Sequence, residues 1–190
     1  MYWIMFSERK DEKETKLMGV PKIVTELDFE CDLGKHITGD YPVIEYDFEE
    51  DDDLDFPNDN LMAPGFKGLL MHKRVSKILR EIEVNNIQEF PVLLKGIDGH
   101  KNSDDYELVN IIGDADIVDY EKSDITLRRP KKIKFIDSLS FIDTSDMPLP
   151  YIFRLTSFLP LIIAHDKVKQ AFEAKNITGF TFYKPEDFYL

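Results

Sequence analysis

Residues 69–79 read Leu-Leu-Met-His-Lys-Arg-Val-Ser-Lys-Ile-Leu, and residues 162–172 repeat the pattern as Ile-Ile-Ala-His-Asp-Lys-Val-Lys-Gln-Ala-Phe. Each copy holds an apolar run, a histidine, a charged pair and an amphipathic helical segment. Apolar residues at 75, 78, 79 and 82, and again at 168, 171 and 172, follow the spacing of one helix face. The repeat predicts two related strand–helix–strand units, with Val75 equivalent to Val168 and Leu79 equivalent to Phe172.

A second pair of matching stretches indicates the strand that follows each helix. Residues 86–92 read Asn-Ile-Gln-Glu-Phe-Pro-Val, and residues 176–182 read Asn-Ile-Thr-Gly-Phe-Thr-Phe. Aligned this way, the first helix is three residues longer than the second. Asp166 is well placed to cap the second helix, because its carboxylate can accept hydrogen bonds from free backbone N–H groups. The first helix has only His72-Lys73 at this place, a poor start, so Lys73 or Arg74 is expected to lie outside the first turn.

Runs rich in β-formers outnumber the two helical segments. They are Tyr2–Phe6, Ile23–Phe29, Tyr41–Phe48, Phe90–Leu94, Tyr106–Ile112, Ile133–Ile136, Tyr151–Leu155 and Gly179–Tyr183. The polar, glycine-containing segment 96–105 predicts a long hairpin loop. These patterns predict the α+β class, with mixed or antiparallel sheets and few helices. We expect one α+β domain over residues 1–190, or two packed subdomains, 1–145 and 146–190, the second holding the second repeat copy.

Composition narrows the kinds of molecule that the protein could bind and the compartment in which it could act. The formal net charge is −13, which argues against non-specific nucleic-acid binding, because phosphate neutralisation needs clustered Lys and Arg. No run approaches the ~20 apolar residues of a membrane span, and the N-terminus lacks the features of a signal peptide. Cys31 is the only cysteine, which fits a reducing compartment such as the cytoplasm. An acidic surface of this kind either keeps a protein soluble or attracts a basic protein partner.

The acidic tract, residues 45–59, is the sharpest local bias in the chain. Its charge density suggests a solvated loop, but interleaved aromatic residues are unusual in such loops. A recognition surface of acids around apolar anchors is therefore the alternative, and it would use Tyr46, Phe48, Glu49, Glu50, Asp51, Asp52, Asp53, Asp55 and Phe56. Neither possible register of the tract fits an EF-hand calcium loop.

The sequence contains no recognisable motif for catalysis or for binding a metal or a phosphate group. The four histidines, His36, His72, His100 and His165, are too scattered for a metal site, and no phosphate-binding glycine pattern or nucleophile motif occurs. We therefore expect no cofactor and no catalytic residues. The basic cluster at 128–134 is expected to pair with the protein's own carboxylates or to lie on a solvated edge.

Three segments resemble a known bacterial family. Residues 149–155 carry an Ile-Phe-Arg-Leu strand, residues 161–182 carry an apolar strand, a short helix and Thr-Gly-Phe-Thr-Phe, and residues 106–113 read Tyr-Glu-Leu-Val-Asn-Ile-Ile-Gly. Together they resemble the eleventh of the numbered immunity-protein families that accompany polymorphic toxins, over roughly residues 70–185. The resemblance implies a protein that binds and neutralises a cognate toxin stoichiometrically, without catalysis.

Two other functions stay open on the sequence. One is an enzyme of unassigned chemistry with a site between the two repeat units, and the other is an adaptor or chaperone of a secreted effector. A concave pocket with converging titratable groups would favour the enzyme, whereas a convex or grooved acidic surface with exposed aromatic residues would favour binding. The sequence leaves the oligomeric state and the identity of the toxin open.

Overall fold

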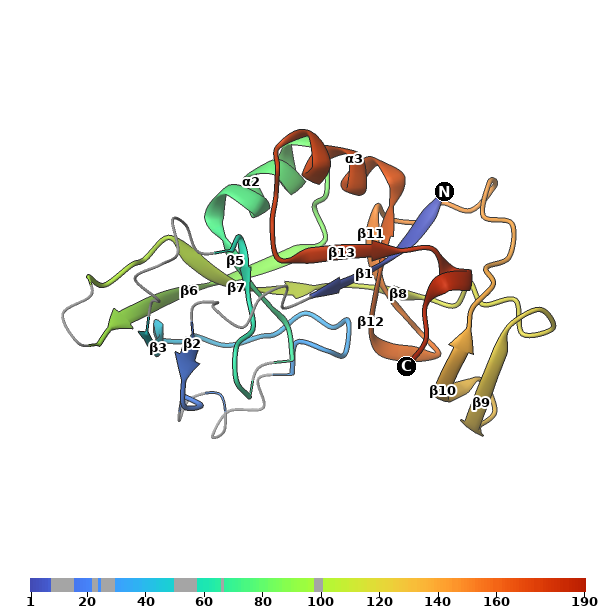
Figure 1. Cartoon of the computed structure of the whole chain (residues 1–190), viewed down its shortest axis with the longest axis horizontal. Helices are drawn as coiled ribbons and strands as arrows, with labels where there is room; N and C mark the ends of the chain where they lie inside the picture. Colours follow the sequence, from blue (N-terminus) through green and yellow to red (C-terminus); the bar gives the residue numbers. More distant parts are fainter. Residues whose placement is uncertain (8–15, 22–23, 25–29, 50–57, 66, 98–100) are drawn as a thin grey trace.

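A computed structural model describes residues 1–190 except 8–15, 22–23, 25–29, 50–57, 66 and 98–100 (Figure 1). The predicted strand at Ile23–Phe29 lies outside the described residues apart from Val24. The described chain is mostly sheet, with mixed and antiparallel pairing and the two helices α2 (Lys73–Glu81) and α3 (Asp166–Ala174), as expected for the α+β class.

The described strands form two large sheets and one separate hairpin. The six-stranded sheet has the order β2 (Lys16–Met18), β3 (Ile44–Glu49), β6 (Ile87–Gly96), β7 (Tyr106–Ile111), β5 (Leu69–His72) and β4 (Asn60–Leu61). The five-stranded sheet has the order β13 (Phe180–Tyr183), β1 (Tyr2–Ser7), β12 (Phe158–His165), β11 (Ile152–Leu155) and β8 (Asp114–Ala115). The hairpin consists of β9 (Asp124–Arg129) and β10 (Lys132–Ser138), and the short 3-10 helix η1 (Pro185–Asp187) follows β13.

The repeat is confirmed, with one addition to the predicted topology. In the first unit β5 and β6 do not pair with each other, because β7 lies between them and is antiparallel to both. In the second unit β1 lies in the same way between β12 and β13. Each unit is therefore a strand–helix–strand crossover split by a strand from elsewhere in the chain. The fourth strand also corresponds, since β4 flanks β5 as β11 flanks β12.

The predicted difference in helix length is wrong. Both helices contain nine residues, and the first strand after each begins 15 positions beyond its histidine, from 72 to 87 and from 165 to 180 in the register of the sheets. Ile87 is thus equivalent to Phe180. The Asn-Ile pairs that suggested the offset occupy different places, because Asn176 belongs to the turn that ends α3 whereas Asn86 follows the corresponding turn.

The two helices end in the same turn. Glu83 and Asn176, each eleven positions after the histidine, have φ values of 68° and 50° in the left-handed region. Val84 N–H donates to the Leu79 carbonyl, and Ile177 N–H donates to the Phe172 carbonyl, both at 2.9 Å. This is the Schellman arrangement, in which a backbone N–H beyond the helix satisfies a carbonyl of its last turn.

The helix caps correct a second expectation. His72 and His165, in extended conformation, accept hydrogen bonds through Nδ1 from the backbone N–H groups of Arg74 and Lys167, at 3.1 and 3.2 Å. Each helix therefore starts directly after its histidine, and Lys73 belongs to the first turn. Asp166 is the first helical residue instead of the cap, and its carboxylate accepts from Trp3 Nε1 at 2.8 Å.

The cap at His165 predicts a pH dependence of stability. Burial, with help from the N-terminal amine and Lys167, lowers the pKa of His165 in the folded state. Its contribution is therefore complete above the unfolded pKa of about 6.5 and is lost as the pH falls through the lower folded value. His165→Asn keeps a capping acceptor that does not titrate. Urea unfolding between about pH 7.5 and pH 5.5 should show a smaller loss of stability in this variant than in wild type.

The control for this experiment is His36→Asn, which changes an exposed histidine outside both helices. It should keep the wild-type dependence on pH. If His165→Asn and wild type lost stability in parallel on acidification, the cap would not be the titrating group.

Both helices cover the same side of the two sheets (Figure 1). Val75, Leu79, Val168 and Phe172 are buried in one continuous apolar cluster that also takes in strands of both units, such as Val109 of β7. Separate clusters fill the opposite face of each sheet. The helical layer therefore joins the two units through a shared core.

The segment after residue 30 is held by polar side chains from both large sheets. Arg154, 1% exposed, donates to the carbonyls of Cys31 at 2.5 Å and Leu159 at 3.0 Å. Asn110 donates to the Lys35 carbonyl at 2.7 Å, and Gln88 exchanges two hydrogen bonds with the backbone of Ile37. Burial lowers the pKa of Arg154 to about 10 and raises that of the Cys31 thiol to about 12. These groups act in packing and are not exposed to solvent.

Among the described helices, none has the length and apolar character needed to cross a membrane.

Candidate functional site

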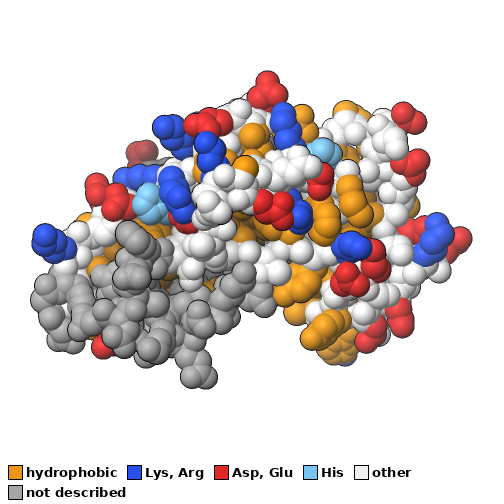
Figure 2. All heavy atoms as spheres, turned by 45° about the horizontal axis from the view of Figure 1, so that its top comes forward, with side chains coloured by type: hydrophobic (Ala, Val, Ile, Leu, Met, Phe, Trp, Pro, Cys, Tyr) orange, Lys and Arg blue, Asp and Glu red, His pale blue; other side chains and the backbone are white. Residues whose placement is uncertain are grey.

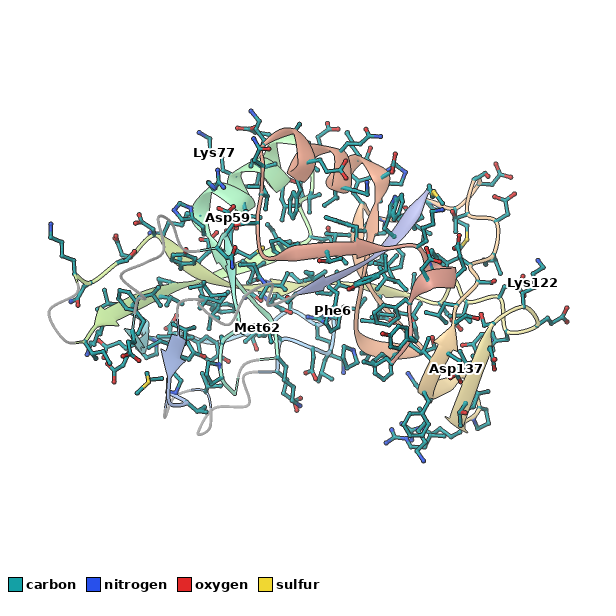
Figure 3. The ribbon with its side chains drawn as sticks, viewed as in Figure 1. Phe6, Asp59, Met62, Lys77, Lys122 and Asp137 are labelled. Carbon is teal, nitrogen blue, oxygen red and sulfur yellow. The ribbon has the colours of Figure 1, made fainter. Side chains whose placement is uncertain are left out.

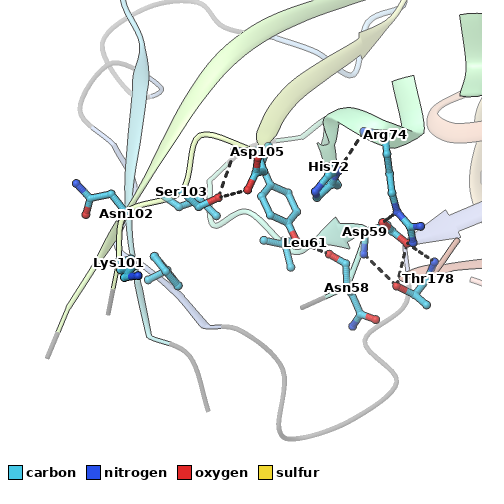
Figure 4. A pocket seen from close by; sticks show the side chains of 13 residues that line it. Asn58, Asp59, Leu61, His72, Arg74, Lys101, Asn102, Ser103, Asp105 and Thr178 are labelled. Carbon is cyan, nitrogen blue, oxygen red and sulfur yellow. Dashed lines mark hydrogen bonds and ion pairs between the residues drawn. The ribbon is translucent and has the colours of Figure 1, made fainter. Parts of the chain in front are cut away.

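A cleft of about 650 Å³ opens beside the start of α2 (Figure 4). We call it the His72 cleft. Its walls come from the ends of β3, β6 and β7, from β4 and β5, and from the segment before β13. The lining residues are Phe48, Asn58, Asp59, Leu61, His72, Arg74, Leu94, Lys101, Asn102, Ser103, Asp105, Tyr106 and Thr178. The cleft thus brings together the acidic tract and the loop at 96–105, which are far apart in sequence.

Asp59 is the most connected polar residue of this cleft. Its carboxylate forms a two-point ion pair with Arg74 and accepts from the backbone N–H of Thr178 at 2.9 Å. Its own N–H donates to the Thr178 hydroxyl at 3.0 Å, and its carbonyl accepts from His72 N–H at 2.7 Å. The Asp59 side chain is 5% exposed, and the hydrogen bonds that it accepts from Arg74 raise the pKa of Arg74. Asp59, labelled in Figure 3, therefore joins the first repeat unit to the segment before β13 of the second.

The neighbouring Asn60 and Gly179 bring the two sheet edges together. Asn60 donates to the Gly179 carbonyl at 3.1 Å. Gly179 has φ +80°, and an added Cβ would lie 2.5 Å from the Asn60 carbonyl oxygen. This approach is open only to glycine, which explains the Thr-Gly-Phe sequence at this point.

A second cleft opens at the equivalent place of the other unit. The His72 ring packs edge-on against Tyr106, its partner across the strands, at 5.3 Å, and His165 packs in the same way against Tyr2 at 5.1 Å. Tyr2 and His165 line a cleft of about 670 Å³ together with Tyr151, Met147 and Ile142. The duplication has therefore produced two related hollows, of which only the first joins the acidic tract.

The structure separates the predicted site residues by strand alternation. On β3, Tyr46 and Phe48 point inward and are 1% and 5% exposed, while Glu45, Asp47 and Glu49 point outward. Tyr46 and Phe48 therefore cannot act as exposed anchors; burial also raises the pKa of Tyr46 to about 12. Phe48 lines the inner end of the His72 cleft. Glu50, Asp51, Asp52, Asp53, Asp55 and Phe56 lie outside the described residues.

Other candidate residues are dispersed. The basic cluster lies on the β9–β10 hairpin, at the opposite end of the molecule from β3 (Figure 1). Among the described residues, no group of three or more His, Cys, Asp or Glu side chains could hold a metal ion.

Sequence reasoning missed Asp59, Arg74 and Thr178 as a group. Arg74 lies 15 positions after Asp59 and Thr178 lies 119 positions after it, so no local pattern connects them. The repeat gave no signal either, because Asp59 precedes β4 and Thr178 precedes β13, two strands that do not correspond in the two units.

The similarity of this chain to a known protein family identifies the family to which it belongs. Residues 40–187 match the family model described as the immunity protein family Imm11, and this region includes both helices and the His72 cleft. The chain belongs to the Imm11 immunity protein family. No curated protein matches the chain.

Proposed function

We propose that this protein binds a cognate toxin made by the same cell and neutralises it stoichiometrically in the cytoplasm. The observation that carries the proposal is the family match over residues 40–187, which includes nearly the whole repeat. Neutralisation would follow from covering the active site of the toxin or from blocking its assembly. No catalytic step is needed, and the Asp59 carboxylate, the most buried acid of the His72 cleft, is already engaged by Arg74 and Thr178.

We further propose that the toxin contacts the outer face of β2–β3 and the adjoining His72 cleft. Asp47 and Glu49 are exposed there, and Met18, 48% exposed, lies opposite Asp47 in the strand pair. Acids around an apolar side chain make a face that fits a basic protein surface. Glu50, Asp51, Asp52, Asp53, Asp55 and Phe56 continue the acidic tract and stay part of the proposed contact.

Neutralising this face should slow toxin association. In Asp47→Asn/Glu49→Gln, we expect a reduced association rate and a weaker dependence on salt, because exposed charges mainly steer the encounter. Met18→Ala should instead mainly accelerate dissociation, because apolar anchors contribute to the bound state. The measurement is binding kinetics against the product of the neighbouring gene at several salt concentrations.

The matched control is Glu81→Gln/Asp146→Asn, which removes the same charge from exposed positions outside the proposed face. Its association rate should stay near that of wild type. Equal rates for both double variants would exclude the β2–β3 face as the contact, while failure of wild type to bind and to rescue cells from the toxin would exclude the function itself.

A further inference from the structure

The β9–β10 hairpin, residues 124–138, carries a concentration of positive charge that the rest of this acidic chain lacks. Five of the seven residues between 128 and 134 are Lys or Arg, and none is acidic. The two strands are joined by a tight turn at Pro130–Lys131, where Lys131 has φ 55°. Most residues of the hairpin are exposed, and it projects at one end of the molecule (Figure 1).

In the part of the chain that the structure describes, no carboxylate pairs with the cations of this hairpin. Helix α2 differs, because three of its four cations are paired: Lys73 with Asp104, Arg74 with Asp59 and Arg80 with Glu89. Of the two arrangements that the sequence left open for the basic cluster, the described residues do not show the first, pairing with the protein's own carboxylates.

A small cleft and exposed apolar side chains accompany the charge. Arg128, Arg129, Lys132 and Lys134 line a hollow of about 370 Å³ between the hairpin and the β11–β12 turn. Asp32 also lines this hollow, but it is only 9% exposed and pairs with Lys67 at 3.5 Å. Leu127 and Phe135 are 44% and 51% exposed, although Ile133 and Ile136 of the same hairpin are buried. Hydrophobic side chains reach the surface at this end of the molecule (Figure 2). Lys132 donates to the Thr156 carbonyl at 2.7 Å, and Lys134 lies over the Phe135 ring at 4.7 Å. Apolar side chains beside cations that form no ion pair with described residues are typical of a binding surface, whereas a solvated edge needs only the charges.

We propose that the β9–β10 hairpin is a second contact element for the toxin and binds an acidic face of it, with carboxylates of the toxin entering the hollow beside Arg128 and Arg129. This inference rests on the proposed function. Because β3 and the hairpin carry opposite charge at opposite ends of the molecule, a toxin contacting both could bind in one orientation only. Such an arrangement selects against toxins of the wrong polarity as well as attracting the right one.

Charge reversal at the tip tests the proposal. Arg128→Glu/Arg129→Glu should lower the association rate with the neighbouring gene's product by roughly tenfold or more at low salt, because like charges then face each other. Phe135→Ala should raise the dissociation rate by about tenfold if its ring is an anchor. The matched control is Lys77→Glu/Lys175→Glu, which makes the same change in charge at exposed positions on and after the helices.

The outcomes separate this inference from the proposed function. Toxin binding by wild type with equal rates for the hairpin variant and the control would overturn the hairpin contact alone. Absence of toxin binding by wild type would overturn both. A labelled DNA duplex that binds wild type more tightly than the toxin does, and loses this binding in the hairpin variant, would make nucleic acid the occupant and would also overturn the proposal. Unchanged thermal unfolding of the variants confirms that binding alone has been altered.

Discussion

Replacing Arg74 by Met is expected to lower the free energy of unfolding by about 3 kcal/mol. The change removes the two-point ion pair with Asp59 and leaves a carboxylate that is only 5% exposed with the hydrogen bonds from Thr178 alone. Breaking one side of a buried ion pair typically costs ~3–5 kcal/mol, and Arg74 lies at the lower end because it is itself half-exposed. The measurement is the urea unfolding midpoint at constant slope.

The second repeat unit offers a matched control. Lys167 occupies the position equivalent to Arg74, two residues after the capping histidine, and pairs at 3.6 Å with Glu83, whose side chain is 78% exposed. Lys167→Met should therefore cost less than about 1 kcal/mol. The Asp59 network would not be the main polar link between the units if the two variants unfolded at the same urea concentration.

Phe172→Ala is expected to cost about 3–5 kcal/mol, and Leu79→Ala about 2–5 kcal/mol, through the cavity that each leaves. These side chains are 2% and 1% exposed and lie at equivalent positions in the shared cluster beneath the helices. Both variants should keep the slope of the denaturant curve while lowering its midpoint.

Glu173→Ala, next to Phe172, provides the control for the cavity variants. Its side chain is 60% exposed, and among the described residues it forms an ion pair with Lys169 of the same helix alone, so about 0.5 kcal/mol or less is expected. A denaturant midpoint that did not change in Phe172→Ala would contradict the core position of this ring.

The periodic part of the sequence predicted the fold well. The apolar spacing located both helices and the equivalences of Val75 with Val168 and of Leu79 with Phe172, because burial imposes that spacing directly. The predictions of the helix caps and of the helix lengths were wrong for local reasons. Histidine is a rare cap, and two Asn-Ile pairs happened to suggest a false alignment.

Non-local contacts explain the remaining differences. Nothing in the sequence near residue 162 indicates that Tyr2–Ser7 lies between β12 and β13, because pairing partners are not encoded by periodicity. The sequence also did not indicate which face of β3 points into the core. Strand alternation predicts that Tyr46 and Phe48 share one face but not which face is buried.

The inserted strands give the two units different folding requirements. The first unit is closed by β7, the next strand along the chain after β6, so the β6–β7 contacts are comparatively local in sequence. The second is closed by β1, whose Tyr2 and Met5 pair with residues more than 150 positions later. Contacts of such high sequence separation form slowly. On the ribosome, residues 2–7 must wait for residues 158–183 to emerge, so the second unit completes after the first. A nascent chain would therefore already have the strands of the first unit, from β4 to β7, while the hollow beside His165 does not yet exist.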